Sequence, residues 1–158
     1  MTVKQKYVLQ LCHDYSIPYL DVARQYTSLF KNTEYKVITA YLIGEKNNTV
    51  IEQTDSDQVL FLENQSKDLR GLKRKQIKQV QKLCSEYEFE FIIAHRFKAM
   101  YISRHVKNMP IIGIHHCFGN YIRFMRRWFV NHHSKNLYLL GVSNAIRDDI
   151  RKYLPKFP

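Results

Sequence analysis

Residues 137–155 hold the feature that most constrains the fold, a short apolar segment followed at once by an amphipathic one. Leu137–Val142 is apolar without a period, which predicts a strand buried on both faces. Ser143 is a favourable N-cap for a helix that Pro155 would end. The helix would bury three residues at helical spacing: Ile146, Ile150 and Leu154. A strand that passes directly into a helix is half of a β–α–β unit and favours a parallel sheet.

The same alternation runs through the whole chain. Six apolar, β-branched-rich runs predict strands: Tyr7–Cys12, Tyr35–Ile43, Gln58–Leu62, Phe89–Ala94, Ile111–His115 and Leu137–Val142. Helical patterns are expected between most of them, near 21–30, 72–87, 99–106 and 120–132, and after the last strand at 144–154. The polar segment 44–57 is expected to be a loop that holds at most a hairpin strand. We therefore predict a three-layer, Rossmann-like α/β domain with a parallel sheet of about six strands and helices on both faces.

One helix can be described more closely from the sequence. Asp21 is a suitable cap for the first helix. Its buried face is expected to contain four apolar residues: Val22, Tyr26, Leu29 and Phe30.

Length and composition limit the class of protein. A chain of 158 residues is one domain of ordinary size. Three cysteines without metal-like spacing predict reduced thiols and a cytoplasmic location. The formal charge of +11 predicts attraction to polyanions, which include nucleic acid, anionic lipid and sugar phosphates.

In parallel α/β sheets, ligands bind beyond the carboxyl ends of the strands. The segments expected there are 12–15, 94–97, 114–117 and 142–144. They contain four of the seven histidines: His13, His95, His115 and His116. Imidazole titrates near neutral pH and can donate to an anion. By strand alternation, we expect one of His115 and His116 to face the cleft and the other to point away.

Two interpretations of His95 remain open at this stage. It either closes a strand and bonds a neighbouring carbonyl, or faces a phosphate or sugar hydroxyl with Arg96 beside it. No glycine-rich phosphate loop follows the first strand, and no metal motif is present. We therefore expect neither a metal nor a bound cofactor.

The segment 118–129 combines aromatic and basic residues. One interpretation is a core-packing helix with solvated arginines. The other is an interfacial helix on an anionic membrane. Its membrane-surface residues would be Arg123, Arg126, Arg127, Trp128 and Phe129. The basic run 70–78 would add a second positive area.

Six segments together resemble the N-terminal domain of retaining bacterial glycosyltransferases with the GT-B fold that build the lipopolysaccharide core. These segments are 8–15, 21–26, 69–73, 93–98, 113–119 and 140–149. One departure is that Ser16, Ile17 and Pro18 stand where many relatives carry a glycine pair, which weakens any claim of main-chain diphosphate contact there.

The resemblance implies that residues 1–158 form an acceptor-binding domain, whereas the nucleotide-sugar would bind a C-terminal domain absent from this chain. It implies catalytic roles for His115 and His116 near the donor phosphates. The acceptor cleft would contain His13, Asp14, Tyr15, His95, Arg96, Ser143 and Asn144. The expected substrates are a nucleotide-sugar donor and a lipid-linked or lipopolysaccharide-core acceptor.

The resemblance also implies a peripheral protein on the inner face of the bacterial inner membrane, inactive without its donor domain. Three other classes remain open. They are half of a sugar-nucleotide epimerase with the same architecture, a basic nucleic-acid-binding module and a standalone membrane-docking domain. Against nucleic acid, no binding motif or stacking platform is present.

Overall fold

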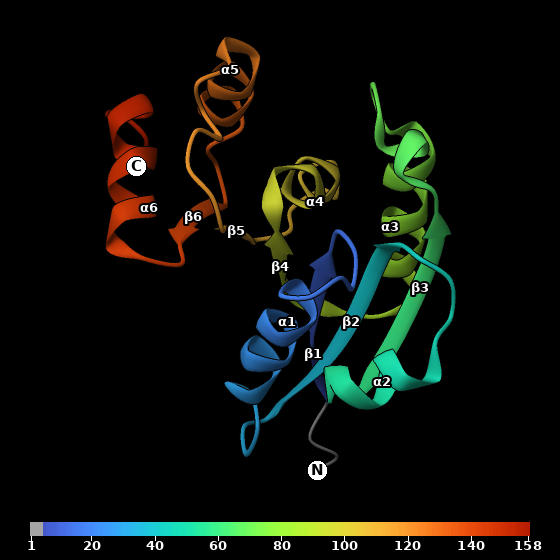
Figure 1. Ribbon diagram of the computed structural model, residues 1–158. Coiled ribbons are helices and arrows are strands. Elements are labelled where there is room, and N and C mark those ends of the chain that lie inside the picture. Colours follow the sequence, from blue (N-terminus) through green and yellow to red (C-terminus); the bar gives the residue numbers. More distant parts are fainter. Residues whose placement is uncertain (1–4) are drawn as a thin grey trace.

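A computed structural model describes residues 5–158 and contains one six-stranded sheet, drawn in Figure 1. Its strands are β1 (Lys6–Cys12), β2 (Tyr35–Ile43), β3 (Gln58–Asn64), β4 (Phe89–His95), β5 (Ile111–His115) and β6 (Leu137–Gly141). All pairs are parallel and the order is β3-β2-β1-β4-β5-β6. The prediction of a Rossmann-like parallel sheet is confirmed.

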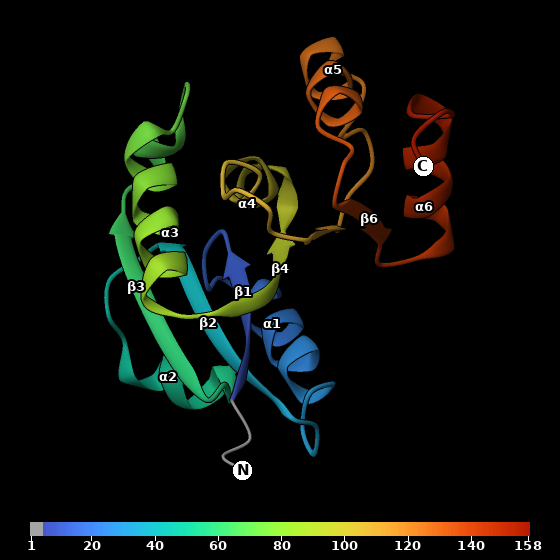
Figure 2. The ribbon, with the colours of Figure 1, turned by 180° about the vertical axis from the view of Figure 1, so that it is seen from behind.

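Helices cover both faces of the sheet, as Figures 1 and 2 show. They are α1 (Tyr19–Ser28), α2 (Asn48–Thr54), α3 (Arg74–Glu86), α4 (Arg96–Ser103), α5 (Phe124–His132) and α6 (Asn144–Tyr153), with a 3-10 turn at Ser66–Leu69. Apolar residues of α3 to α6 share one core cluster with the sheet, whereas α1 and α2 pack on its other face. The three predicted layers are therefore present.

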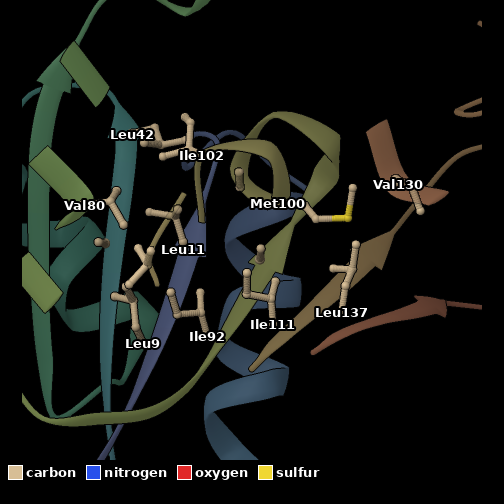
Figure 3. Packing of buried hydrophobic residues seen from close by; sticks show 14 of the residues in the cluster. Leu9, Leu11, Leu42, Val80, Ile92, Met100, Ile102, Ile111, Val130 and Leu137 are labelled. Atoms are coloured by element: carbon tan, nitrogen blue, oxygen red, sulfur yellow. The ribbon is translucent and has the colours of Figure 1, made fainter. Parts of the chain in front are cut away.

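The main core lies between the sheet and the α3–α6 layer, and Figure 3 shows part of it. Leu9, Leu11 and Ile92 are fully buried on this face of the sheet. Burial of each such side chain contributes roughly 1.5–3 kcal/mol to folding. Met100 of α4 is also fully buried, and a Cβ atom at Gly113 of β5 would lie 2.6 Å from its sulfur. The small residue lets α4 lie close to β5.

The prediction of a loop at 44–57 was wrong, because α2 lies there. The Asn47 side chain caps α2 and accepts a hydrogen bond from Val50 N at 3.2 Å. Thr54 is buried and bonds the Tyr41 hydroxyl at 2.8 Å. Only Val50 and Thr54 face the core, so the helix is too short and too polar to show an apolar period.

The first helix was placed imprecisely. It begins at Tyr19, so Asp21 lies inside its first turn and is not the cap. The fully buried residues are Leu20, Ala23 and Thr27, whereas Leu29 is 68% exposed and Val22, Tyr26 and Phe30 are half-buried. Small Ala23 lets the helix approach the sheet, and this shifts the buried face away from the larger apolar residues.

β6 was predicted to be buried on both faces, and this was wrong. It is the edge strand, and α1 does not extend over it (Figure 1). Tyr138 and Leu140 are therefore exposed on the α1 side of the sheet, while Leu137 is buried on the other. An apolar run cannot by itself distinguish an inner strand from an edge strand with one uncovered face.

Candidate functional site

The carboxyl ends of β1, β4 and β5 meet at one edge of the sheet, where a cleft of about 230 Å³ opens. In Figure 1 the arrowheads of β1 and β4 point to this edge, and α4 starts from it. The titratable side chains that line the cleft are His13, Arg96, Lys98, His115, His116 and Arg126, together with the thiol of Cys117. Four of these were predicted as site residues from strand-end positions alone: His13, Arg96, His115 and His116.

A buried hydrogen-bond chain supports the floor of the cleft. Gln10 is fully buried, and its side-chain nitrogen donates to the carbonyl oxygen of Ala23 at 3.1 Å and to Thr39 Oγ1 at 2.9 Å. Its oxygen therefore faces His95 Nε2, at 3.0 Å. His95 Nδ1 in turn lies 3.2 Å from His116 Nε2. His95 is thus a buried link between the sheet and His116 and does not line the cleft.

These hydrogen bonds determine which nitrogen carries the proton in the rings of His95 and His116. The Gln10 oxygen can only accept, so His95 Nε2 carries a proton and donates to it. Burial and the neighbouring His116 lower the pKa of His95 to about 3, so the ring is neutral and its Nδ1 accepts. His116 Nε2 must then donate. Burial and the charge of Arg96 lower the pKa of His116 as well. Neutral His116 is left with a lone pair on Nδ1.

Arg96 lies at the turn between β4 and α4. Its Nη1 is 3.8 Å from Asp14 Oδ2, and its guanidinium stacks 4.9 Å from the ring centre of Tyr19. The same carboxylate is 3.8 Å from His13 Nε2. Arg96 adopts a φ of 73°, in the left-handed region, which costs a non-glycine residue about 1–2 kcal/mol. The turn therefore places this side chain at the cleft at some cost in stability.

His115 contacts Tyr121, whereas His116 contacts Tyr19 and His95, so the two rings have different neighbours, but both line the cleft. The expectation that one points away was wrong, because His115 is the last residue of β5 and His116 follows it, so both lie where the strand opens into the cleft. His115 is 1% exposed and its Nε2 lies 2.9 Å from the Tyr121 hydroxyl. Among residues 5–158, its Nδ1 has no hydrogen-bond partner.

Three predicted cleft residues lie elsewhere. Tyr15 packs against Tyr41 and Phe61, and its ring occupies the space that a side chain at Gly44 would need. Ser143 caps α6, where its hydroxyl accepts a hydrogen bond from Ile146 N at 3.3 Å. Ser143 and Asn144 line a separate hollow of about 520 Å³ beside β6.

The predicted membrane-surface residues separate into three groups. Phe129 is 8% exposed and packs on Tyr101 in the core, so it does not belong to a surface. Arg126 is half-buried and lines the cleft. Trp128 is exposed, and Arg123 and Arg127 are exposed or partly exposed next to it.

Five apolar side chains on or shortly before α5 are each at least half exposed: Phe118, Ile122, Phe124, Met125 and Trp128. We call these five residues, with Arg123 and Arg127, the α5 surface. Phe118 also lines the cleft, so the α5 surface and the cleft are adjacent. One face of α5 therefore packs in the core and the other is apolar and exposed, whereas contact of this segment with a membrane stays a prediction.

Four further residues at the site were not singled out from the sequence: Gln10, Tyr19, Lys98 and Tyr121. The buried hydrogen bonds of Gln10 could have been predicted, because a polar residue inside the apolar run Tyr7–Cys12 needs buried partners. Tyr121 lies in the aromatic and basic segment 118–129, for which no contact with His115 was predicted. Its hydroxyl contact with His115 depends on the chain turning back before α5, which no local pattern specifies.

Across residues 5–158, no three His, Cys, Asp or Glu side chains are grouped as a metal site would require. The same part of the chain contains no helix with the length and apolar character needed to cross a membrane.

Comparisons with known proteins identify the fold. No protein-family model matches the sequence, and no curated protein matches it. A solved glycosyltransferase from Rickettsia africae aligns over 97% of this chain and 41% of its own, with a TM-score of 0.71 at 12% identity. A solved UDP-N-acetylglucosamine 2-epimerase aligns over 94% of this chain and 45% of its own, with a TM-score of 0.64 at 8% identity.

A second structure of the epimerase type, from Listeria monocytogenes, aligns over 96% of this chain and 43% of its own, with a TM-score of 0.65 at 10% identity. The chain thus spans less than half the length of each of these proteins. At such low identities the likeness shows a shared fold. That fold is the Rossmann-like half of a two-domain, GT-B-like architecture.

The buried histidines predict that stability depends on pH. Burial, with Arg96 nearby, lowers the pKa of His13 to about 4, and burial beside His116 lowers those of His95 and His115 to about 3 and about 4. Unfolded histidine titrates near 6.5, so between about pH 6.5 and 4 the unfolded chain binds more protons. The free energy of unfolding should fall with decreasing pH, by up to about 1.4 kcal/mol per pH unit for each histidine.

Urea unfolding between about pH 7.5 and 4.5 measures this slope. His95→Gln keeps a polar side chain and removes one titrating group. The free energy of unfolding of this variant should therefore change less with pH, by about the contribution of one histidine. Stability that does not change over this interval would contradict the burial of neutral histidines.

Proposed function

We propose that this chain is the acceptor-binding, N-terminal domain of a glycosyltransferase with the GT-B fold. The observation that carries the proposal is the cleft at the carboxyl edge of the sheet, where His13, Arg96, His115 and His116 meet. The fold shared with the R. africae glycosyltransferase supports it. A C-terminal domain would bind the nucleotide-sugar, and the acceptor would be lipid-linked or part of a lipopolysaccharide core.

The geometry is compatible with the part of such a transfer that this half would perform. Neutral His116 would accept a hydrogen bond at Nδ1 from the acceptor hydroxyl and hold it toward the donor sugar. The acceptor oxygen would bond to the sugar carbon as the bond from that carbon to the nucleotide diphosphate breaks, and the hydroxyl proton would pass to the departing diphosphate oxygen. Arg96 would offset negative charge on the departing diphosphate. On this proposal the domain contributes orientation and charge and requires neither a metal nor a bound cofactor.

Half of a nucleotide-sugar epimerase is the second candidate, favoured by the two epimerase structures that share the fold. Such an enzyme would turn over a nucleotide-sugar without an acceptor. The same cleft would then contact the sugar nucleotide itself. Nucleic acid is not among the partners we propose, since the cationic side chains at the rim gather in a narrow cleft rather than along a stacking platform.

Titration of the 15N-labelled chain with a deacylated lipopolysaccharide core oligosaccharide tests the first candidate. We expect shifts at His13, Arg96 and His116, and no sugar transfer when a nucleotide-sugar is added. His116→Gln should weaken binding about tenfold, because a hydrogen bond in the cleft is lost. His132→Gln, an exposed histidine at the end of α5, is the matched control.

Three outcomes would contradict this assignment. They are binding of UDP-N-acetylglucosamine but not of the oligosaccharide, turnover of a nucleotide-sugar by the chain alone, and tight, salt-sensitive binding to RNA or DNA. The first outcome would favour the epimerase candidate.

We also propose that the α5 surface attaches the protein to the inner face of the bacterial inner membrane. Phe124, Met125 and Trp128 would enter the headgroup region, while Arg123 and Arg127 would contact anionic lipids. Phe118 belongs to both the α5 surface and the cleft, so attachment would bring the cleft to a membrane-held acceptor. Each arginine near such a surface contributes about 1 kcal/mol.

Trp128 is the only tryptophan, so its fluorescence reports on this surface directly. We expect a blue shift with vesicles that contain phosphatidylglycerol and none with phosphatidylcholine alone. The double variant Arg123→Gln/Arg127→Gln should bind at least about tenfold more weakly. Arg24→Gln/Arg151→Gln removes the same charge from α1 and α6 and is the control. Equal partitioning into both kinds of vesicle would contradict attachment through the arginines.

A further inference from the structure

Lys98 in the first turn of α4 is a half-buried cation that lines the cleft. None of the hydrogen bonds or ion pairs found within residues 5–158 involves its ammonium group. Partial burial costs the charge of a lysine some of its hydration, and a bound anion would offset that cost. The absence of a protein partner suggests that an external anion completes this site.

Two further cations line the same cleft. Arg126 lies 4.6 Å from the ring centre of Phe97 and donates through Nη1 to the carbonyl oxygen of Asn120 at 3.2 Å. Arg96 lies over the ring of Tyr19. Aromatic rings hold both guanidinium groups in place without neutralising them. Both groups therefore keep positive charge and hydrogen-bond donors for a ligand.

Carboxylates neutralise little of the positive charge at this site. Asp14 contacts Arg96 only at 3.8 Å, and it also accepts a hydrogen bond from Ser16 N at 2.9 Å. Asp149 accepts a hydrogen bond from Gly119 N at 2.8 Å. Neither carboxylate forms an ion pair with Lys98 or Arg126 in the part of the chain that the structure describes.

The cations also act on one another. Burial together with the charges of Arg96, Arg126 and Arg70 lowers the pKa of Lys98. Burial and the charge of Arg123 lower the pKa of Arg126. Like charges gathered in a half-buried cleft are unfavourable until an anion binds there. The first turn of α4 adds the positive end of the helix dipole on the same side.

We propose that Lys98, Arg126 and Arg96 form a subsite for a phosphate group carried by the sugar substrate. A phosphate presents several oxygen atoms to separate donors and suits the combination of two guanidinium groups and an ammonium group. Only the identity of the molecule that carries the phosphate rests on the proposed function. It is either a phosphorylated acceptor sugar or the diphosphate of the donor, and both present the same chemistry.

Calorimetry on the 158-residue chain tests the subsite with four probes: inorganic phosphate, glucose 6-phosphate, glucose and UDP. Saturable binding of glucose 6-phosphate and not of glucose is expected, and it should weaken with added salt. Tighter binding of glucose 6-phosphate than of UDP would identify a phosphorylated acceptor, and the reverse order would identify the donor diphosphate. Either order supports the subsite, because the probes share the phosphate.

Lys98→Gln and Arg126→Gln should each weaken phosphate binding at least about tenfold, as expected for the loss of one charge-assisted hydrogen bond. Lys152→Gln is the control, since it removes the same charge from α6 at a residue that does not line the cleft. Amide spectra of each variant would show that the fold is intact. The inference is overturned if phosphate does not saturate the chain below about 10 mM, or if Lys98→Gln binds as Lys152→Gln does.

A failure of this inference can be told apart from a failure of the proposed function. Phosphate binding is measured on the chain without any sugar transfer. Phosphate binding without oligosaccharide recognition would support the subsite and contradict the proposal that this chain binds the acceptor. Oligosaccharide recognition by a chain that does not bind phosphate saturably would overturn the subsite and leave the acceptor assignment in place.

Discussion

The side-chain amide of Gln10 is the contact on which the arrangement of the cleft depends. It lies inside the sheet, where an unpaired amide would cost about 1–3 kcal/mol, and every polar atom it carries is bonded. Its nitrogen ties β1 to α1 and β2, and its oxygen fixes the ring of His95. His95 then fixes His116 at the edge of the cleft. One buried residue thus links the packing of the sheet to the chemistry at its edge.

Several features of this edge cost stability, and they lie close together. Arg96 has a left-handed backbone, His95 and His115 are buried in neutral form with His13 half-buried beside them, and Lys98 has no hydrogen-bond or ion-pair partner among residues 5–158. Strained and uncompensated groups that gather at one cleft are typical of binding and catalytic sites.

Much of the fold was predictable because strands of a parallel sheet are encoded locally as apolar runs. The bounds of β2 and β5 were predicted without error, and the histidines at strand ends followed from topology. The failures have a common cause. The core position of Thr54, the exposed face of β6 and the packing of Tyr15 against Gly44 depend on tertiary contacts that no local pattern contains. Lys98 was overlooked because α4 begins three residues before the predicted helix.

The most direct test of the account is 15N NMR of the imidazole rings at neutral pH, which reports which nitrogen carries the proton. We predict that His95 and His116 are both neutral and protonated at Nε2, and that Gln10→Leu removes this preference in His95. A proton on Nδ1 of His116, or a charged His95, would show that the hydrogen bonds from Gln10 through His95 to His116 do not set the protonation of these two rings. That result would contradict the central claim.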